Sequence, residues 1–358
     1  MTKTCEAFRS TAMKWFNGCL AGHAMCQEQK ISSDWLPSRL IDVGLFSDSK
    51  EPRLVLESEL QGQENIYYTT LSHRWASTGI VTLNSGCIDS FRRCIPLESL
   101  SATFLDAIDA TKALGVQYLW IDSLCILQDS LSDWQAESAN MGDIYKHGVC
   151  NFAATASSDY GGGLFQNRDL AWVGRQKVRI QYDGHDRAYL ASIGNLWGRW
   201  VSRTTLHKRG WVLQERMLSP RTLHFGRQLF WECRMLQACE TYPEGLPDEH
   251  GDLYEEVDGF DHPLTTKNWL DECKGSEFWK ELVEIYGRCS ITKPYDRLIA
   301  VAGVAKALQP LLNDKYLAGI WEKDLPYNLA WGIANVEGEV QRSNHYRCMT
   351  LLCLTITC

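Results

Sequence analysis

The run YLWIDSLCILQD, residues 118–129, constrains this 358-residue chain more than any other stretch, because it is almost entirely apolar. Gly115 precedes it and polar residues follow it, so its length suits a strand buried on both faces, as in a parallel sheet covered by helices. One carboxylate, Asp122, interrupts the run. Burying an unpaired carboxylate costs several kcal/mol, so Asp122 needs a partner, a proton or a place where the strand opens into a cleft. The alternative is an aspartate that caps a neighbouring turn.

Predicted strands and helices alternate around this run. A β-rich stretch, 66–71, ends abruptly at polar residues, and residues 100–114 predict a helix that Gly115 stops. Ser132 and Gln135 form a capping box that predicts the start of a second helix, and VCNFAATAS predicts another buried strand. This alternation predicts an α/β fold with a doubly wound, mostly parallel sheet.

The rest of the chain is less regular, and we expect four segments. These are an N-terminal helix and linker (1–58), an α/β core (59–170), a C-terminal α+β extension packed on the core (171–340) and an irregular tail (341–358). Within the extension, KRGWVLQERMLSP predicts a short helix, TLHFGRQLFWECR a hairpin, and residues 276–312 two further helical segments.

Composition excludes several classes of protein. Hydrophobic residues make up 45% of the chain and charged residues 22%, with a net charge of −8 and no Lys/Arg-rich stripe, so we expect no nucleic-acid partner. No stretch approaches 18 consecutive apolar residues and no secretory signal opens the chain, so we expect a cytoplasmic protein without a membrane span. The fourteen cysteines are scattered, which fits reduced thiols.

One group of residues has the types that bind metal. In CLAGHAMC, Cys19, His23 and Cys26 share a helix face with Trp15. A zinc site needs a fourth ligand, and the sequence does not identify one. Packing of this face against the domain is therefore the favoured interpretation, and we expect no metal.

Polar groups converge at one end of the predicted sheet, the carboxyl ends of the strands. Open α/β sheets bind their ligands at this end. The turn at 72–75, the segment 122–128 and the start of the second helix all belong to this end. Glu137 lies on or beside the apolar stripe of that helix, where desolvation raises a carboxyl pKa toward the range of a general acid or base. The alternative is a structural ion pair with Arg74 or Arg209.

The segment RGWVLQER forms a second polar cluster, which could grip a carboxylate or phosphate or could latch the extension to the core. Cys125 could be a nucleophile, but a buried thiol is favoured since no base is identifiable. No phosphate loop, dinucleotide fingerprint, nucleophile elbow or zincin motif occurs, so we expect no cofactor. The candidate catalytic residues are Asp122 and Glu137, and the candidate ligand-binding residues are Ser72, His73, Arg74, Trp75, Cys125, Gln128, Trp134, Arg209, Trp211, Gln214 and Glu215.

Several of these stretches together resemble the fungal heterokaryon incompatibility (HET) domain over residues 15–325. They are YYTTLSHRWAS, the helix and strand in 100–129, the block DWQAESANMGDIYKHGVCNFAATASSDYGGGLFQNRD, and RGWVLQERMLSPRTLHFGRQLFWECR. The core is also similar to the Toll/interleukin receptor (TIR) fold, whose enzymatic members cleave the nicotinamide bond of NAD. That resemblance implies Glu137 as the catalytic carboxylate, although it follows Trp134 by three positions where the TIR pattern has four.

Three functions remain open. The resemblance implies a cell-death effector of fungal incompatibility, acting on NAD as a substrate through Glu137. A tryptophan-rich scaffold without a cofactor motif could instead be an enzyme of specialised metabolism that steers a cyclisation, pericyclic reaction or dehydration. The third function is a non-catalytic module that signals by self-association. The expected partner is accordingly a small-molecule ligand or a second copy of the chain.

Overall fold

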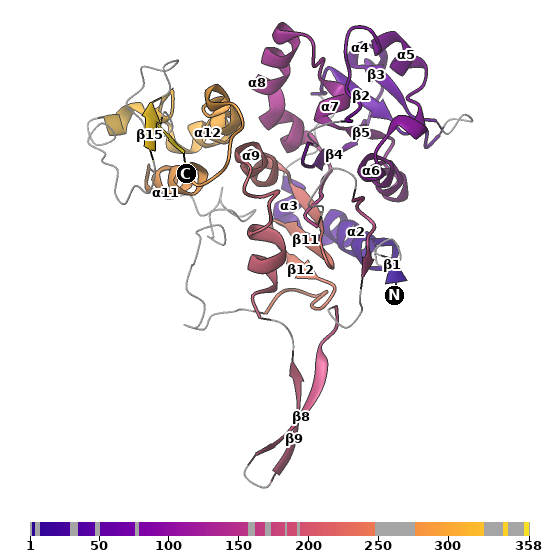
Figure 1. Ribbon diagram of the computed structural model, residues 1–358, viewed down its shortest axis with the longest axis vertical. Coiled ribbons are helices and arrows are strands. Elements are labelled where there is room, and N and C mark those ends of the chain that lie inside the picture. Colours follow the sequence, from indigo (N-terminus) through magenta and orange to yellow (C-terminus); the bar gives the residue numbers. More distant parts are fainter. Residues whose placement is uncertain are drawn as a thin grey trace.

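A computed structural model of the chain describes residues 2–3, 8–28, 35–46, 51–75, 79–156, 162–168, 173–182, 185–191, 194–247, 276–325, 339–342 and 354–357. An eight-stranded sheet lies at its centre, in the order β12-β11-β10-β6-β4-β5-β2-β3 (Figure 1). The bounds of its strands are β2 Arg39–Asp42, β3 Arg53–Leu56, β4 Tyr68–Ser72, β5 Tyr118–Trp120, β6 Cys150–Ala153, β10 Arg221–Phe225, β11 Leu229–Cys233 and β12 Gln237–Cys239.

The middle of this sheet is parallel, because β5, β4, β6 and β10 pair in parallel. Their spatial order is 2-1-3-4 when they are numbered along the chain, which is how flavodoxin-like sheets begin. Antiparallel strands extend both edges: β2 and β3 beyond β5, and β11 and β12 beyond β10. The expected α/β class is thus confirmed, while these edges depart from a wholly parallel doubly wound sheet.

The helices that cover the sheet are mostly short. Their bounds are α2 Met13–Gly22, α3 Ala24–Glu28, α4 Glu57–Leu60, α5 Ile88–Arg93, α6 Ala102–Ala113, α7 Asp122–Cys125, α8 Leu131–His147, α9 Gly210–Leu218, α11 Ser276–Gly287 and α12 Ile299–Leu312. Two π-helical turns, η1 (Phe8–Ala12) and η4 (Gly198–Ser202), and three 3-10 turns, η2 (Leu97–Ser99), η6 (Pro294–Asp296) and η7 (Glu322–Asp324), also occur.

Helices α6 and α8 lie on opposite faces of β4. The Thr69 hydroxyl contacts the Thr111 hydroxyl of α6 at 2.7 Å, whereas the hydroxyl of the neighbouring Tyr68 donates to the Ile144 carbonyl of α8 at 2.7 Å. Consecutive strand residues point to opposite faces, so the two contacts place one helix on each side. Parallel connections that leave β4 and β5 on opposite faces create a switch point between β4 and β6.

The predicted elements match the structure closely in places. Helix α6 begins at its cap Ser101 and is followed by Gly115, whose φ of 74° explains why glycine stops this helix. Helix α9 and the hairpin β10–β11 lie where they were expected. Helix α8 begins earlier than predicted, because Ser130 rather than Ser132 is its cap and accepts from the Asp133 amide at 3.3 Å.

The prediction of one long strand over 118–129 was wrong. Strand β5 ends at Trp120, and Asp122 opens the short helix α7. The apolar run is nevertheless buried, since Leu119, Ile121 and Leu124 have no exposed surface. A buried single-turn helix and a buried strand have the same apolar composition, so this run could not distinguish them.

Strands from the first three expected segments contribute to the one sheet: β2 and β3 come from 1–58, β4 to β6 from 59–170 and β10 to β12 from 171–340. Helices α9, α11 and α12 share a second hydrophobic cluster, which contains Trp279, Tyr286 and Trp321. Figure 1 shows α11 and α12 beside the sheet and a long hairpin projecting from it; the hairpin is β8 (Gln176–Tyr182) with β9 (His185–Ala191).

Short two-stranded pairs complete the described structure. They are β1 (Thr2–Lys3) with β7 (Asn167–Arg168), β13 (Tyr316–Leu317) with β14 (Ile320–Trp321), and β15 (Glu339–Arg342) with β16 (Leu354–Thr357). Most of the tail expected to be irregular, and most of the glycine-rich stretch 159–163, lies outside the described residues. Among the helices that are described, none is long and apolar enough to cross a bilayer.

Candidate functional site

The carboxyl end of β4 delivers His73 into the interior. Its side chain is 2% exposed, and its ring meets Phe104 of α6 edge-on at 5.1 Å. Nδ1 lies 3.8 Å from Oδ1 of Asp122, and Nε2 is buried without a hydrogen-bond partner in the described structure. Burial lowers the pKa of His73 although the nearby Asp122 opposes that effect, so the imidazole is held neutral at pH 7.

Asp122 follows β5, the neighbour of β4, and therefore reaches the same edge of the sheet. Its Oδ1 accepts from the Ser123 amide at 2.7 Å, and its Oδ2 accepts from the indole Nε1 of Trp75 at 2.7 Å. The Asp122 side chain is 26% exposed and Trp75 is 38% exposed. These two residues thus form the solvent-facing side of the edge, with His73 behind them. The contact of Asp122 with His73 is the one that the strand order predicts.

Glu215 of α9 is the most unusual carboxylate of this edge. It is only 6% exposed, and its Oε2 has no hydrogen-bond partner in the described structure. Burial raises the pKa of Glu215 to about 7, against the opposing effects of the Ser72 hydroxyl, the Arg209 guanidinium and the Tyr145 hydroxyl. A carboxyl group with this pKa is close to half-ionised at neutral pH, which is the condition for transferring protons in either direction.

Arg209 ties these groups together from the N-terminal end of α9. Its Nη1 donates to the backbone carbonyl of His73. Its charge also acts on both the His73 ring and the Glu215 carboxylate, as does the charge of Asp122. We call Ser72, His73, Asp122, Arg209 and Glu215 the carboxyl-edge cluster. It lies at the carboxyl ends of the parallel strands β4 and β5, under α9.

A polar network below the cluster fixes Ser72. Asn151 of β6 donates from Nδ2 to the Ser72 hydroxyl at 2.9 Å, and its Oδ1 accepts from the Thr70 hydroxyl at 3.0 Å. Tyr145 of α8 donates to the Leu71 carbonyl at 3.3 Å. Neither Tyr145 nor Asn151 was predicted to belong to the site. Asn151, like Asp122, is a polar residue within an apolar run. That interruption is the sequence feature that could have identified Asn151 as part of the site.

Glu137 lies elsewhere on α8. It is 2% exposed, and its Oε1 is 3.7 Å from Nη2 of Arg39 in β2. The same Arg39 nitrogen binds Asp133 at 2.6 Å, and Arg39 Nε donates to the Cys125 carbonyl at 2.6 Å. Burial raises the pKa of Glu137, which the Ser38 hydrogen bond and Arg39 oppose. The ion-pair partner of Glu137 is thus Arg39, which was not predicted, rather than Arg74 or Arg209.

Several other candidate ligand-binding residues have structural contacts. Cys125 is fully buried, and burial raises its thiol pKa to about 12, which keeps it protonated. Gln128 donates to the carbonyls of Asp122 and Ile126 at 3.2 and 3.1 Å, and it thereby fixes the loop after α7. Gln214 accepts from the Gly303 amide of α12 at 2.7 Å, so it joins α9 to α12.

The remaining three candidates are more open. Trp134 lies under the ammonium group of Lys293 at 6.0 Å, and Trp211 hydrogen-bonds Asp296. Both therefore face the turn that precedes α12 rather than the carboxyl-edge cluster. Arg74 is partly exposed beside His73.

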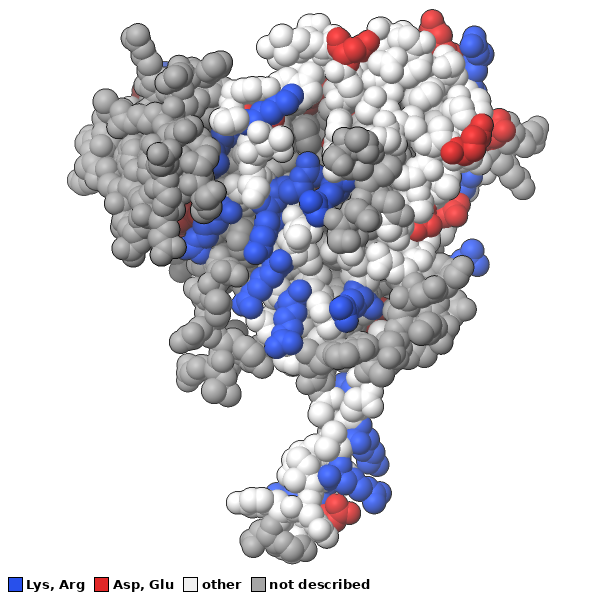
Figure 2. All heavy atoms as spheres, in the orientation of Figure 1, with Lys and Arg blue, Asp and Glu red and all other residues white. Residues whose placement is uncertain are grey.

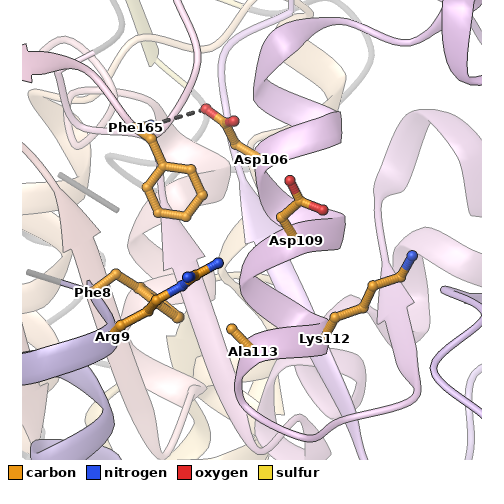
Figure 3. Close-up of a pocket in the computed structure, with 7 residues that line it drawn as sticks. All are labelled: Phe8, Arg9, Asp106, Asp109, Lys112, Ala113 and Phe165. Carbon is orange, nitrogen blue, oxygen red and sulfur yellow. Dashed lines mark hydrogen bonds between the residues drawn. The ribbon is translucent and has the colours of Figure 1, made fainter. Parts of the chain in front are cut away.

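A separate pocket of about 530 Å³ lies between η1 and α6 (Figure 3). Phe8, Arg9 and Phe165 line it together with Asp106, Asp109, Lys112 and Ala113. Asp106 is already engaged, because its Oδ2 accepts from the Leu164 and Phe165 amides at 2.6 and 2.9 Å. Figure 3 shows Asp106 turned toward Phe165. Asp106 therefore holds the loop that contains Leu164 and Phe165 on α6.

Charge is unevenly distributed although the chain is acidic overall. Figure 2 shows a band of Lys and Arg side chains on the face that displays η4 and α9, and acidic side chains toward the opposite upper edge. The segment from η4 to α9 contains Arg199, Arg203, Lys208 and Arg209. A basic band that ends at Arg209, the residue before α9, favours the approach of an anionic ligand to this face.

Comparison with known proteins supports the resemblance seen in the sequence. Residues 68–215 match the family model described as heterokaryon incompatibility protein (HET). The match begins at the first residue of β4 and ends at Glu215, so it contains the whole carboxyl-edge cluster. No curated protein and no solved structure matches the chain.

Proposed function

We propose that this chain is a HET-type incompatibility effector that hydrolyses NAD at the carboxyl-edge cluster. The observation that carries the proposal is Glu215, a buried carboxylate with an unpartnered oxygen and a pKa of about 7, beside the carboxyl ends of β4 and β5. The match of residues 68–215 to the HET family supports the biological role. The likeness to the TIR fold, whose enzymatic members cleave NAD, suggests the substrate.

The chemistry requires one base and one water. Water attacks C1′ of the nicotinamide ribose, the bond from C1′ to the nicotinamide nitrogen breaks with its electron pair moving to the ring, and one proton is released. The products are ADP-ribose and nicotinamide. Glu215 in its ionised form accepts the proton from water, and the neutral His73 can hold the water or a ribose hydroxyl through Nε2.

The surroundings suit a dinucleotide. Trp75 is 38% exposed at the solvent-facing side of the cluster, and an indole can stack on a nicotinamide or adenine ring. The basic band over η4 and α9 (Figure 2) suits the two phosphates. Asp122 holds Trp75 in place through the 2.7 Å hydrogen bond, so Asp122 positions the stacking residue as well as the charge next to His73.

The proposal is tested with the purified full chain at high concentration, by measuring NAD loss and nicotinamide release by chromatography. We expect turnover by the wild type and its loss in Glu215→Gln, because the amide cannot accept a proton. Glu57→Gln changes an exposed glutamate of α4 and serves as the matched control with unchanged activity. No nicotinamide release from the folded, concentrated wild type overturns the NAD proposal.

A further inference from the structure

Four potential metal ligands meet beneath the N-terminal helices. They are Cys19, His23, Cys26 and Cys233, whose ligand atoms all lie within 4.8 Å of one another. The three cysteines are at most 3% exposed, and His23 is partly buried. We call these residues the Cys3His cluster. It is separate from the carboxyl-edge cluster and is not used in the proposed reaction.

The fold assembles this cluster from two distant parts of the chain. Cys19 lies in α2 and Cys26 in α3, while His23 occupies the break between these helices. Cys233 is the last residue of β11. Local spacing thus supplies three ligands, and the fourth comes from a strand that packs against the helices only in the folded chain. This is the ligand that the sequence could not identify.

The spacing of the four atoms suits a tetrahedral ion. With Zn–S bonds of about 2.3 Å, two sulfurs of a tetrahedral zinc site lie about 3.8 Å apart. Nδ1 of His23 lies 3.3 Å from Sγ of Cys233. All four ligand atoms lie within 4.8 Å of one another, and the three cysteines are free thiols rather than disulfide partners.

A buried arginine supplies an independent observation. Arg221 is 1% exposed, and its Nε donates to Sγ of Cys19 at 3.1 Å. Its other donors reach the Val149 and Cys26 carbonyls at 3.4 and 3.3 Å, and no carboxylate contacts it within the described part of the chain. A buried guanidinium beside neutral thiols would lack a counter-ion, which costs several kcal/mol. Thiolate sulfur at Cys19 removes that cost.

The charges balance when a divalent ion is included. Three thiolates, one neutral imidazole and Zn²⁺ carry a net charge of −1, which the guanidinium of Arg221 neutralises. Soft thiolate ligands with one imidazole select zinc among the common divalent ions.

We propose that the Cys3His cluster binds one structural Zn²⁺ that fastens the N-terminal helices to the edge of the central sheet. All four positions of a tetrahedral ion are taken by protein atoms, as in structural rather than catalytic zinc sites. Cys233 pairs in register with Arg221, the first residue of β10. The site therefore lies at the amino edge of the parallel strands, opposite the carboxyl-edge cluster.

The first test measures the metal content of the full chain by inductively coupled plasma mass spectrometry. The chain is purified without chelators or metal-affinity steps. We expect about one zinc per chain in the wild type and loss of most of it in Cys19→Ser and Cys233→Ser. Cys239→Ser is the matched control, since Cys239 is also buried, lies on the adjacent strand β12 and stands outside the cluster. We expect this control to keep its zinc.

The second test does not depend on the variants folding. A mercurial thiol reagent added to the wild type should release zinc, seen with a colorimetric zinc indicator, in proportion to the thiols that react. Replacement of zinc by Co²⁺ should give the visible absorption of a tetrahedral, thiolate-bound ion. A folded wild type that carries no zinc and shows no such Co²⁺ absorption, or one in which intact-mass analysis finds a disulfide between cluster cysteines, overturns the proposal.

Discussion

Nη2 of Arg39 lies 3.7 Å from Oε1 of Glu137, and both side chains are almost completely buried. This pair joins β2, the strand between β5 and the edge strand β3, to the middle of α8. Arg39 also binds Asp133 and the Cys125 carbonyl, so a single guanidinium connects three elements. Arg39 favours the charged form of Glu137 against the effect of burial, whereas at Glu215 burial outweighs the charge of Arg209 and raises the pKa to about 7.

We expect Arg39→Met to lower the free energy of unfolding by about 3 kcal/mol, because it leaves the buried Glu137 and its neighbour Asp133 without a cation. Denaturant unfolding measures the change. Arg92→Met is the matched control: Arg92 pairs with Glu59 at 3.1 Å, but its side chain is 42% exposed, so we expect a loss of less than about 1 kcal/mol. Equal losses in the two variants would contradict a structural role for the Arg39 pair.

The stability of the chain should depend on pH through Glu215. Burial raises the pKa of Glu215 from 4.5 to about 7, so the folded state binds the proton more tightly than the unfolded state. This contribution is present below about pH 4.5 and is lost as the pH rises to about 7. Relative to Glu215→Gln, which carries no titratable group, the wild type should lose up to roughly 3 kcal/mol over this range. Unfolding curves at several pH values measure it, and a pH-independent difference between the two proteins would contradict the raised pKa.

The contact between α8 and α12 should not tolerate a larger residue. A Cβ added at Gly142 would lie 2.8 Å from the Gly303 Cα and 3.2 Å from a methyl group of Leu218. Gly142→Ala should therefore cost about 1–3 kcal/mol, as overpacking usually does. Gly18→Ala, in the middle of α2 with nothing within 4 Å of the added Cβ, should instead stabilise by about 0.5–1 kcal/mol. Thermal unfolding compares them, and stabilisation by Gly142→Ala would show that the two helices can separate.

Local signals in the sequence identify much of the sheet and its helices. The cap Ser101, the stop at Gly115 and the alternating hairpin of β10 and β11 each depend on residues close in sequence, and the structure has all three. Strands β2 and β3 were missed, because each has four residues and is stabilised by antiparallel pairing with the edge of the sheet rather than by its own pattern. The length of β5 was misjudged for another reason: an apolar, buried run has the same composition in a strand and in a turn of helix.

The candidate site, too, has contacts that the sequence predicts and contacts that it does not. The meeting of His73 with Asp122 follows from the pairing of β4 with β5, which alternation along the sequence predicts. The partner of Glu137 could not be predicted, because Arg39 lies on a strand that was not recognised. Glu215 was expected as a ligand-binding residue, but its burial against Ser72 and Tyr145 depends on how α9 packs over the sheet. Contacts between elements far apart in the chain leave no local pattern.

The comparison of Glu137→Gln with Glu215→Gln in the NAD assay tests the central claim most directly. Both substitutions remove one buried carboxylate and keep the shape of the side chain, so circular dichroism and unfolding curves serve to confirm that both variants are folded. We predict that Glu215→Gln lowers the rate of nicotinamide release about 10²- to 10⁴-fold, the usual effect of removing a general base, while Glu137→Gln stays within a few-fold of the wild type. Loss of activity in Glu137→Gln with retention in Glu215→Gln would contradict the account and would move the reactive carboxylate to the Arg39 side of α8.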